Sequence, residues 1–242
     1  MKFHAPLIEG VLVSRYKRFF ADVRLPSGEV VTAHCANSGS MLSVNTAGAR
    51  VWLSPAANPE RKLRYTWEII EIDGGPVGIN TAHPNALVAE AITAGKIPEL
   101  AGYASLKREQ KYGKNSRIDI LLESPGRPPC YVEVKNVTLK RGAGPNDPAE
   151  FPDSVTERGA KHLIEMTDMV KSGARAVMVY LVQRGDCRRF RVAADLDPTY
   201  AKGLKTALAQ GVEAVCYGCE VKPDGITIGK ALTVDLPSSD HM

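Results

Sequence analysis

The chain has 242 residues, of which 44% are hydrophobic and 24% are charged, and its formal net charge is +4. These values exclude an intrinsically disordered chain, which has few apolar residues and a large net charge, and they exclude a histone-like polycation. So small a net charge permits nucleic-acid binding without indicating it, because the distribution of the charge decides that question.

Residues 1–81 are predicted to form a small β-barrel. Val, Ile and aromatic residues gather in short runs that turn formers separate, and the runs lie at 7–13, 19–25, 29–35, 49–53 and 65–72. The sequence of this part contains no convincing helix. A barrel of about five short strands is typical of the OB fold.

The pattern changes at residue 82, and residues 82–242 are predicted to form an α/β domain. Asn85 is the expected N-cap of a short helix that ends at Gly95. Ser154 and Glu157 have the spacing of a capping box and predict a helix that ends near Gly173. The other expected elements are an extended stretch at 103–110, strands at 117–122, 131–138, 176–182, 213–221 and 226–235, and a helix at 198–210.

Two strands of this domain carry charged residues among apolar ones. Asp119 is the one carboxylate within 117–122, and Glu133 and Lys135 point to the same face of 131–138 because side chains alternate along a strand. If the two strands form a hairpin, Asp119 reaches that face too. Charges in such a place need partners, and paired carboxylates suit Mg²⁺ or Mn²⁺. A neighbouring lysine can orient a water or stabilise charge on a phosphate.

The spacing of these residues resembles the PD-(D/E)xK nuclease motif, although the usual proline before the aspartate is absent. Asp119, Glu133 and Lys135 are the expected catalytic residues, with Asp119 and Glu133 as ligands of Mg²⁺ or Mn²⁺. Nucleases of that superfamily often carry a further metal ligand on the first core helix, where this sequence has Glu90. Two alternatives stay open, namely a structural salt-bridge cluster of the three strand residues and an exposed helix carboxylate at Glu90.

Longer segments carry a second resemblance, and they lie in order at 34–41, 80–85, 90–92, 116–119, 132–139 and 151–163. They resemble the sugar fermentation stimulation protein A family over nearly the whole chain. Ala36 departs from the family, which usually has proline there. The resemblance implies an N-terminal OB-like β-barrel, a C-terminal restriction-endonuclease-like αββαβ domain, largely non-specific DNA binding and a link to the regulation of sugar (maltose) catabolism.

Basic residues gather locally even though the net charge is small. The cations expected to contact nucleic acid are Arg15, Lys17, Arg18, Lys107, Arg108, Lys111, Lys114, Arg117, Lys140 and Arg141. Aromatic residues at 16, 19 and 20 alternate with the first group and could stack on single-stranded bases, although core packing is the alternative for 19 and 20. An ordinary solvated face is the alternative for each basic group.

Two functional hypotheses follow. The first is a DNA-binding protein, on duplex or single strands, that influences sugar-catabolic genes; the second is an Mg²⁺- or Mn²⁺-dependent nuclease that cleaves DNA or RNA. A metal that only holds the fold together is a third, weaker interpretation. No apolar run is long enough for a membrane helix, so a membrane is not an expected partner. Five scattered cysteines fit the cytoplasm, and a homodimer is left open.

Overall fold

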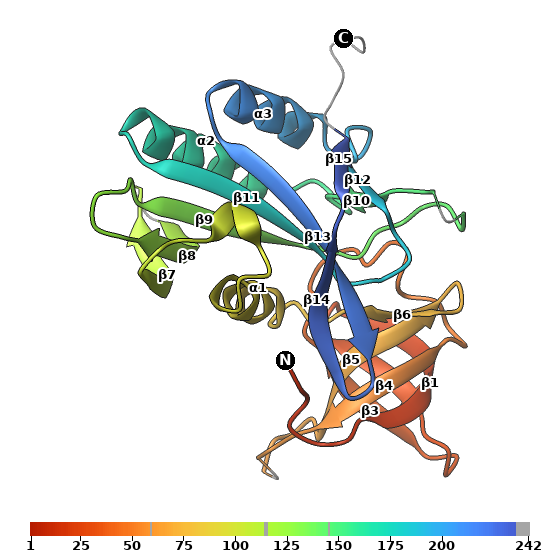
Figure 1. Ribbon diagram of the computed structural model, residues 1–242. Coiled ribbons are helices and arrows are strands. Elements are labelled where there is room, and N and C mark those ends of the chain that lie inside the picture. Colours follow the sequence, from red (N-terminus) through yellow and green to blue (C-terminus); the bar gives the residue numbers. More distant parts are fainter. Residues whose placement is uncertain (59, 114–115, 145, 236–242) are drawn as a thin grey trace.

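The structure is a computed structural model that describes residues 1–58, 60–113, 116–144 and 146–235. Within these residues the chain forms a lower β-barrel and an upper α/β layer structure (Figure 1). No helix in the described part of the chain is long and apolar enough to cross a membrane.

The barrel is a six-stranded sheet in the order β3-β2-β1-β4-β5-β6, closed by a parallel pairing of β3 with β5. Its strands are β1 Ile8–Tyr16, β2 Phe20–Arg24, β3 Val30–Cys35, β4 Arg50–Pro55, β5 Tyr65–Ile72 and β6 Gly75–Gly78. Alternate residues of these strands, among them Leu12, Leu53 and Trp67, fill the core. Strand β6 was not predicted, because the turn is confined to Asp73 and Gly74, whose positive φ angles form a tight hairpin.

The upper part is built on a second six-stranded sheet in the order β14-β13-β11-β9-β8-β7. Its strands are β7 Ser105–Tyr112, β8 Ser116–Glu123, β9 Cys130–Val137, β11 Arg175–Val182, β13 Glu213–Lys222 and β14 Gly225–Ala231. Strands β9, β11 and β13 are parallel, and the other neighbours are antiparallel. Apolar side chains project from both faces of the central strands, so each face of the sheet has its own hydrophobic core.

Helices cover both faces of this sheet. Helix α1, Pro84–Thr93, packs on one face, and helices α2, Glu157–Lys171, and α3, Pro198–Ala209, pack on the other (Figure 1). A short 3-10 helix η1, Pro98–Leu100, precedes β7. The short strands β10 Ala149–Phe151, β12 Arg189–Val192 and β15 Thr233–Asp235 form a small parallel sheet beside the main one.

The predicted fold class, an OB-like barrel followed by a restriction-endonuclease-like α/β domain, is confirmed. Both predicted caps are corrected. Helix α2 begins after Thr156, whose side chain accepts a hydrogen bond from the Gly159 amide at 3.1 Å, and not at Ser154. Helix α1 begins at Pro84, so Asn85 lies inside its first turn and its side chain is free to bond elsewhere.

The barrel is joined to the upper domain through the buried carboxylate of Glu68 on β5. This carboxylate accepts hydrogen bonds from Ser54 Oγ at 2.6 Å and Asn80 Nδ2 at 2.8 Å, and it binds His83 Nε2 at 2.7 Å. Burial opposes its ionisation, but the hydrogen bonds from His83 and Ser54 hold the pKa of Glu68 below its usual value. Since His83 directly precedes α1, the barrel fixes where that helix begins.

Replacing Glu68 by Gln should lower the free energy of unfolding by about 2 kcal/mol at pH 7, because an amide cannot accept all of these hydrogen bonds. A carboxyl whose pKa is lowered in the folded state stabilises the fold above its ordinary pKa of 4.5. That contribution is lost as the pH falls further, so the difference between wild type and variant should narrow in acid.

Urea denaturation of both proteins between pH 4 and pH 7 measures this difference. Glu60→Gln is the matched control, because Glu60 is exposed on a barrel loop. A Glu68→Gln variant as stable as the Glu60→Gln variant at pH 7 would contradict the role given to the buried carboxylate.

Candidate functional site

Asp119 lies at an interruption in the pairing of β7 with β8. The paired residues are 105–108 with 120–123 and 110–112 with 116–118, which leaves Glu109 and Asp119 outside the described ladder. Glu109 has φ +54°, and Ile118 and Ile120 belong to cores on opposite faces of the sheet. The register is the same on both sides of this gap, so the hairpin twists at Asp119 without a bulge.

The twist turns the Asp119 carboxylate toward two donors. Asn85 Nδ2 on α1 donates to Asp119 Oδ1 at 2.7 Å, and the Val134 amide on β9 donates to Oδ2 at 2.7 Å. The same Asn85 nitrogen also lies 3.2 Å from Glu109 Oε1. Asp119 is thus held between α1 and the middle of β9.

Glu133 and Lys135 lie on the face of β9 that α2 covers. Lys135 Nζ donates to Glu133 Oε1 at 2.8 Å, and His162 Nδ1 on α2 donates to the same oxygen. Arg158 Nε donates to His162 Nε2 at 3.4 Å, so both ring nitrogens of His162 are engaged. Glu133 Oε2 is buried and finds no hydrogen-bond partner among the residues that the structure describes.

The pKa values of Asp119 and Glu133 are shifted in opposite directions. Burial and the charge of the neighbouring Glu133 raise the pKa of Asp119 to about 6. Burial also opposes ionisation of Glu133, but the hydrogen bond from His162 and the charge of Lys135 lower the pKa of Glu133. Two acids therefore lie next to each other in a buried site. Their proximity and the Glu133 Oε2 atom, which has no donor within the described residues, fit a bound cation.

The donor set suits a hard divalent cation that keeps part of its water shell. Within residues 1–58, 60–113, 116–144 and 146–235, no three His, Cys, Asp or Glu side chains gather into a complete metal site. Mg²⁺ characteristically takes one or two protein carboxylates and completes its shell with waters and phosphate oxygens. Asp119 and Glu133 supply those two carboxylates, and Lys135 adds a cation that is 12% exposed.

The structure does not bring Glu90 to this site, which corrects the expectation that it is a metal ligand. Its carboxylate binds the amino group of Met1 at 3.0 Å and is 59% exposed. The same amino group also donates to the Ile226 carbonyl on β14. Glu90 thus lies at the edge of α1 next to β14, whereas the first turn of that helix faces Asp119.

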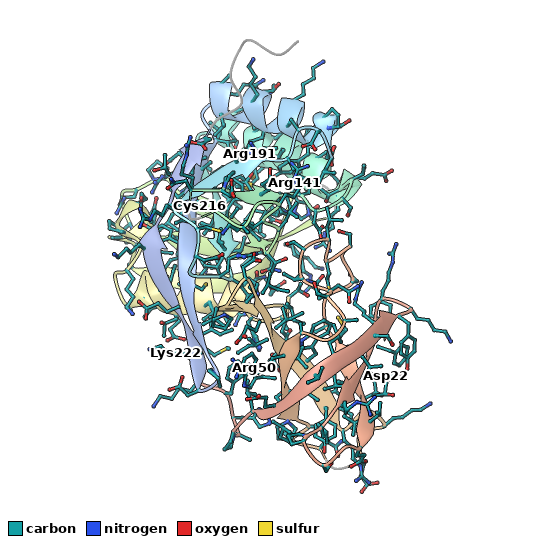
Figure 2. All side chains as sticks on the ribbon, turned by 90° about the vertical axis from the view of Figure 1, so that its right-hand side faces the viewer. Asp22, Arg50, Arg141, Arg191, Cys216 and Lys222 are labelled. Carbon is teal, nitrogen blue, oxygen red and sulfur yellow. The ribbon has the colours of Figure 1, made fainter. Side chains whose placement is uncertain are left out.

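Four of the cations expected to contact nucleic acid are engaged within the protein instead. Arg15 donates to the backbone carbonyls of Arg18, Asn37 and Gly39, and Lys107 pairs with Glu123 at 2.7 Å. Lys140 is buried against Asp186 at 2.8 Å. Arg141 binds Asp195 and Glu150, and Glu150 lies on β10 of the small sheet. Arg191 on β12 binds the same glutamate (Figure 2). These side chains have partners within the protein, and their contact with nucleic acid stays a prediction.

The other expected cations lie in two exposed places. Lys17 and Arg18 form the tip of the β1–β2 hairpin, beside a stacked pair of Tyr16 and Phe20 whose ring centroids lie 5.6 Å apart. Arg108, Lys111 and Arg117 are exposed on β7 and β8, on either side of the twist at Asp119. Lys114 lies outside the described residues.

Sequence reasoning gave Asn85 only the role of a helix N-cap and placed neither Asn85 nor His162, the two side chains that orient the carboxylates, in the site. Both fall in segments that carry the family resemblance, and this was the one signal available. Their contacts join α1 to β8 and α2 to β9, so they follow from tertiary packing and not from local spacing.

Comparison with known proteins agrees with the fold. Residues 82–225 match the sugar fermentation stimulation protein RE domain, and residues 13–79 match the SfsA N-terminal OB domain. A sugar fermentation stimulation protein homolog of Paramagnetospirillum magneticum is 62% identical over 98% of each chain. A homolog of Rhodospirillum rubrum is 61% identical over 98% of this chain and 100% of its own.

A solved structure is also similar. The structure of Pyrococcus furiosus SfsA in complex with Ca²⁺ is 28% identical in sequence, covers 97% of this chain and 98% of its own, and has a TM-score of 0.86. The matched domains span both parts of the fold described above, and the bacterial homologs extend over almost the whole length. The chain therefore belongs to the sugar fermentation stimulation protein A family.

Proposed function

We propose that this protein is a divalent-cation-dependent nuclease in which Asp119 and Glu133 hold Mg²⁺ or Mn²⁺. The observation that carries the proposal is the Glu133 carboxylate, an ionised group 2% exposed and adjacent to a second acid. In the described part of the chain its Oε2 atom has no hydrogen-bond donor. The Ca²⁺ complex of the Pyrococcus furiosus relative supports a hard divalent cation in this chain too.

The side chains of the site would have different roles in phosphodiester hydrolysis. The chemistry that a divalent ion supplies when bound is polarisation of a phosphate and a lowered pKa of a bound water. Lys135 holds Glu133 Oε1 and presents its remaining ammonium protons, which can donate to a phosphate oxygen as charge develops on it. His162 fixes the Glu133 carboxylate from α2, and Asn85 fixes Asp119 from α1.

Nucleic acid is the proposed substrate class. The exposed cations Arg108, Lys111 and Arg117 flank the twist at Asp119, where a phosphate backbone would reach the carboxylates. In this proposal a domain of residues 82–242 carries the chemistry, and a barrel of residues 1–81 adds a further contact with nucleic acid. DNA is the proposed physiological target, with a role in the regulation of sugar catabolism.

Purified protein should cleave plasmid DNA, single strands or RNA in Mn²⁺ and leave them intact in EDTA. Asp119→Asn and Lys135→Ala should each lower the cleavage rate at least about a hundredfold, because each removes a group that stabilises charge in the transition state. Glu90→Gln is the matched control on α1 and should keep the rate within about twofold.

Folding of the inactive variant can be checked independently. Because burial and Glu133 raise the pKa of Asp119 to about 6, its ionised form destabilises the folded state at pH 7.5. Asp119→Asn removes this repulsion and keeps an acceptor for one of its two donors, Asn85 or the Val134 amide, so circular dichroism should show a folded protein at the assay temperature. Intact substrates of all three kinds in Mn²⁺ with folded wild-type protein would contradict the nuclease proposal.

A second candidate function, DNA binding without cleavage, is favoured by the β1–β2 hairpin. Its tip presents Lys17 and Arg18 next to the stacked rings of Tyr16 and Phe20. Phe19, at the same tip, is 48% exposed. Cations beside accessible aromatic faces are the usual platform for single-stranded nucleic acid, and this hairpin lies on the barrel and not in the metal site.

The double variant Lys17→Gln with Arg18→Gln should weaken DNA binding and flatten its salt dependence. The slope of log K against log salt should fall by about 0.9 for each duplex phosphate that the protein no longer neutralises, or by about 0.7 on single strands. Fluorescence anisotropy measured over a series of salt concentrations gives this slope.

The matched control is Lys202→Gln with Lys205→Gln, which removes two exposed charges from α3. The same loss of affinity in both double variants would show that only net charge matters and would contradict a binding site on the hairpin.

A further inference from the structure

A second carboxylate, Glu165 on α2, lies on the same side of the sheet as Glu133. Residues three apart on a helix share a face, so Glu165 follows His162 along the buried face of α2. Glu165 is 7% exposed. Among the residues that the structure describes, neither of its carboxylate oxygens has a hydrogen-bond partner. The exposed Lys161 lies one helical turn away, and its Nζ is 3.6 Å from Oε1.

The hydroxyl of Tyr112 is buried beside these acids. The side chain is 7% exposed, and its hydroxyl also lacks a partner within the described ranges. Burial, followed by the charges of Glu133, Glu165 and Asp119, raises the pKa of Tyr112. The phenol therefore lies near all three carboxylates, and its oxygen accepts no hydrogen bond from the described residues.

The backbone next to Tyr112 packs closely against the Glu165 carboxylate. Gly113 has φ +57°, and a Cβ atom built on it would lie 3.2 Å from Glu165 Oε1. A side chain at this position would crowd the buried carboxylate. The glycine thus combines a backbone conformation that other residues rarely adopt with close approach to a buried acid.

Four buried oxygens thus lack a partner in the described structure, namely Oε2 of Glu133, both carboxylate oxygens of Glu165 and the hydroxyl of Tyr112. Leaving such groups without partners is costly, and native proteins rarely do so. Oxygen donors of this kind, with no sulfur and no free imidazole among them, match a hard divalent cation.

We propose that Glu133 and Glu165 hold a second divalent cation on the α2 face of the sheet, with the Tyr112 hydroxyl as a further oxygen ligand. The inference rests on the proposed function, because Glu133 would be shared between this ion and the one at Asp119. It gives Glu165 the place of third acidic ligand that sequence reasoning assigned to Glu90. Two ions that share a carboxylate are the arrangement that stabilises both the attacking and the leaving oxygen in phosphodiester hydrolysis.

The test is the number of Mn²⁺ ions bound per chain, measured by calorimetry and by electron paramagnetic resonance on the full-length protein. Wild type should bind two ions, and Glu165→Gln and Asp119→Asn should each bind one. Glu157→Gln is the matched control, because Glu157 is exposed at the start of the same helix, and it should still bind two. Tyr112→Phe removes only the hydroxyl and should lower the affinity for the second Mn²⁺ ion by about tenfold.

Two results would overturn the inference and leave the proposed function standing. The first is that Glu165→Gln still binds two ions. The second is that wild type binds a single ion, which Asp119→Asn abolishes and Glu165→Gln keeps.

Failure of the proposed function gives a different result. An ion lost in Glu165→Gln and fully kept in Asp119→Asn would support the Glu165 site and contradict the proposed role of Asp119. If Glu165→Gln fails to fold, an unchanged affinity of both ions in Tyr112→Phe overturns the site as proposed.

Discussion

The site depends on one electrostatic constraint, the ionised carboxylate of Glu133 in the middle of the sheet. A buried acid stays ionised only where donors and positive charge compensate for the lost water. His162 and Lys135 do so at Oε1, whereas Oε2 has no donor among the residues that the structure describes. Asp119 adds a second negative charge and does not offset the first, and its own raised pKa reflects that repulsion together with its burial. This arrangement is the basis of the proposed divalent-cation site.

The barrel contributes to this site through a short series of contacts. Glu68 in the barrel holds His83, His83 precedes α1, and Asn85 in the first turn of α1 donates to Asp119. A second connection joins the barrel loop at Met41, whose amide donates to Asp153 Oδ2 at 2.9 Å, to the segment before α2. Both helices that orient the carboxylates are therefore tied to the barrel. A nucleic acid on the β1–β2 hairpin would lie in a fixed relation to the carboxylates.

The sequence predicted those parts of the structure that depend on local patterns. Alternation along 131–138 placed Glu133 and Lys135 on one face, and the turn formers and apolar runs predicted five of the barrel strands. The spacing could not reveal that Glu90 is engaged elsewhere, because its partner is the amino group of Met1, far away in the chain. The ion pairs of Lys140 and Arg141 were missed for the same reason, because Asp186 and Asp195 approach them only in the folded chain. The role inferred for Glu165 depends on Tyr112 and Gly113 on β7 and the turn after it, which no pattern within α2 could indicate.

Anomalous diffraction from a crystal soaked in Mn²⁺ tests the proposed cation site directly. We expect a peak that bridges Asp119 and Glu133 Oε2, with metal–oxygen distances of about 2.1 Å, the value typical of small divalent cations with oxygen ligands. Full occupancy elsewhere on the protein, with no peak between these two carboxylates, would contradict a cation site at the pair. In that case Asp119, Glu133 and Lys135 would be a buried salt-bridge cluster.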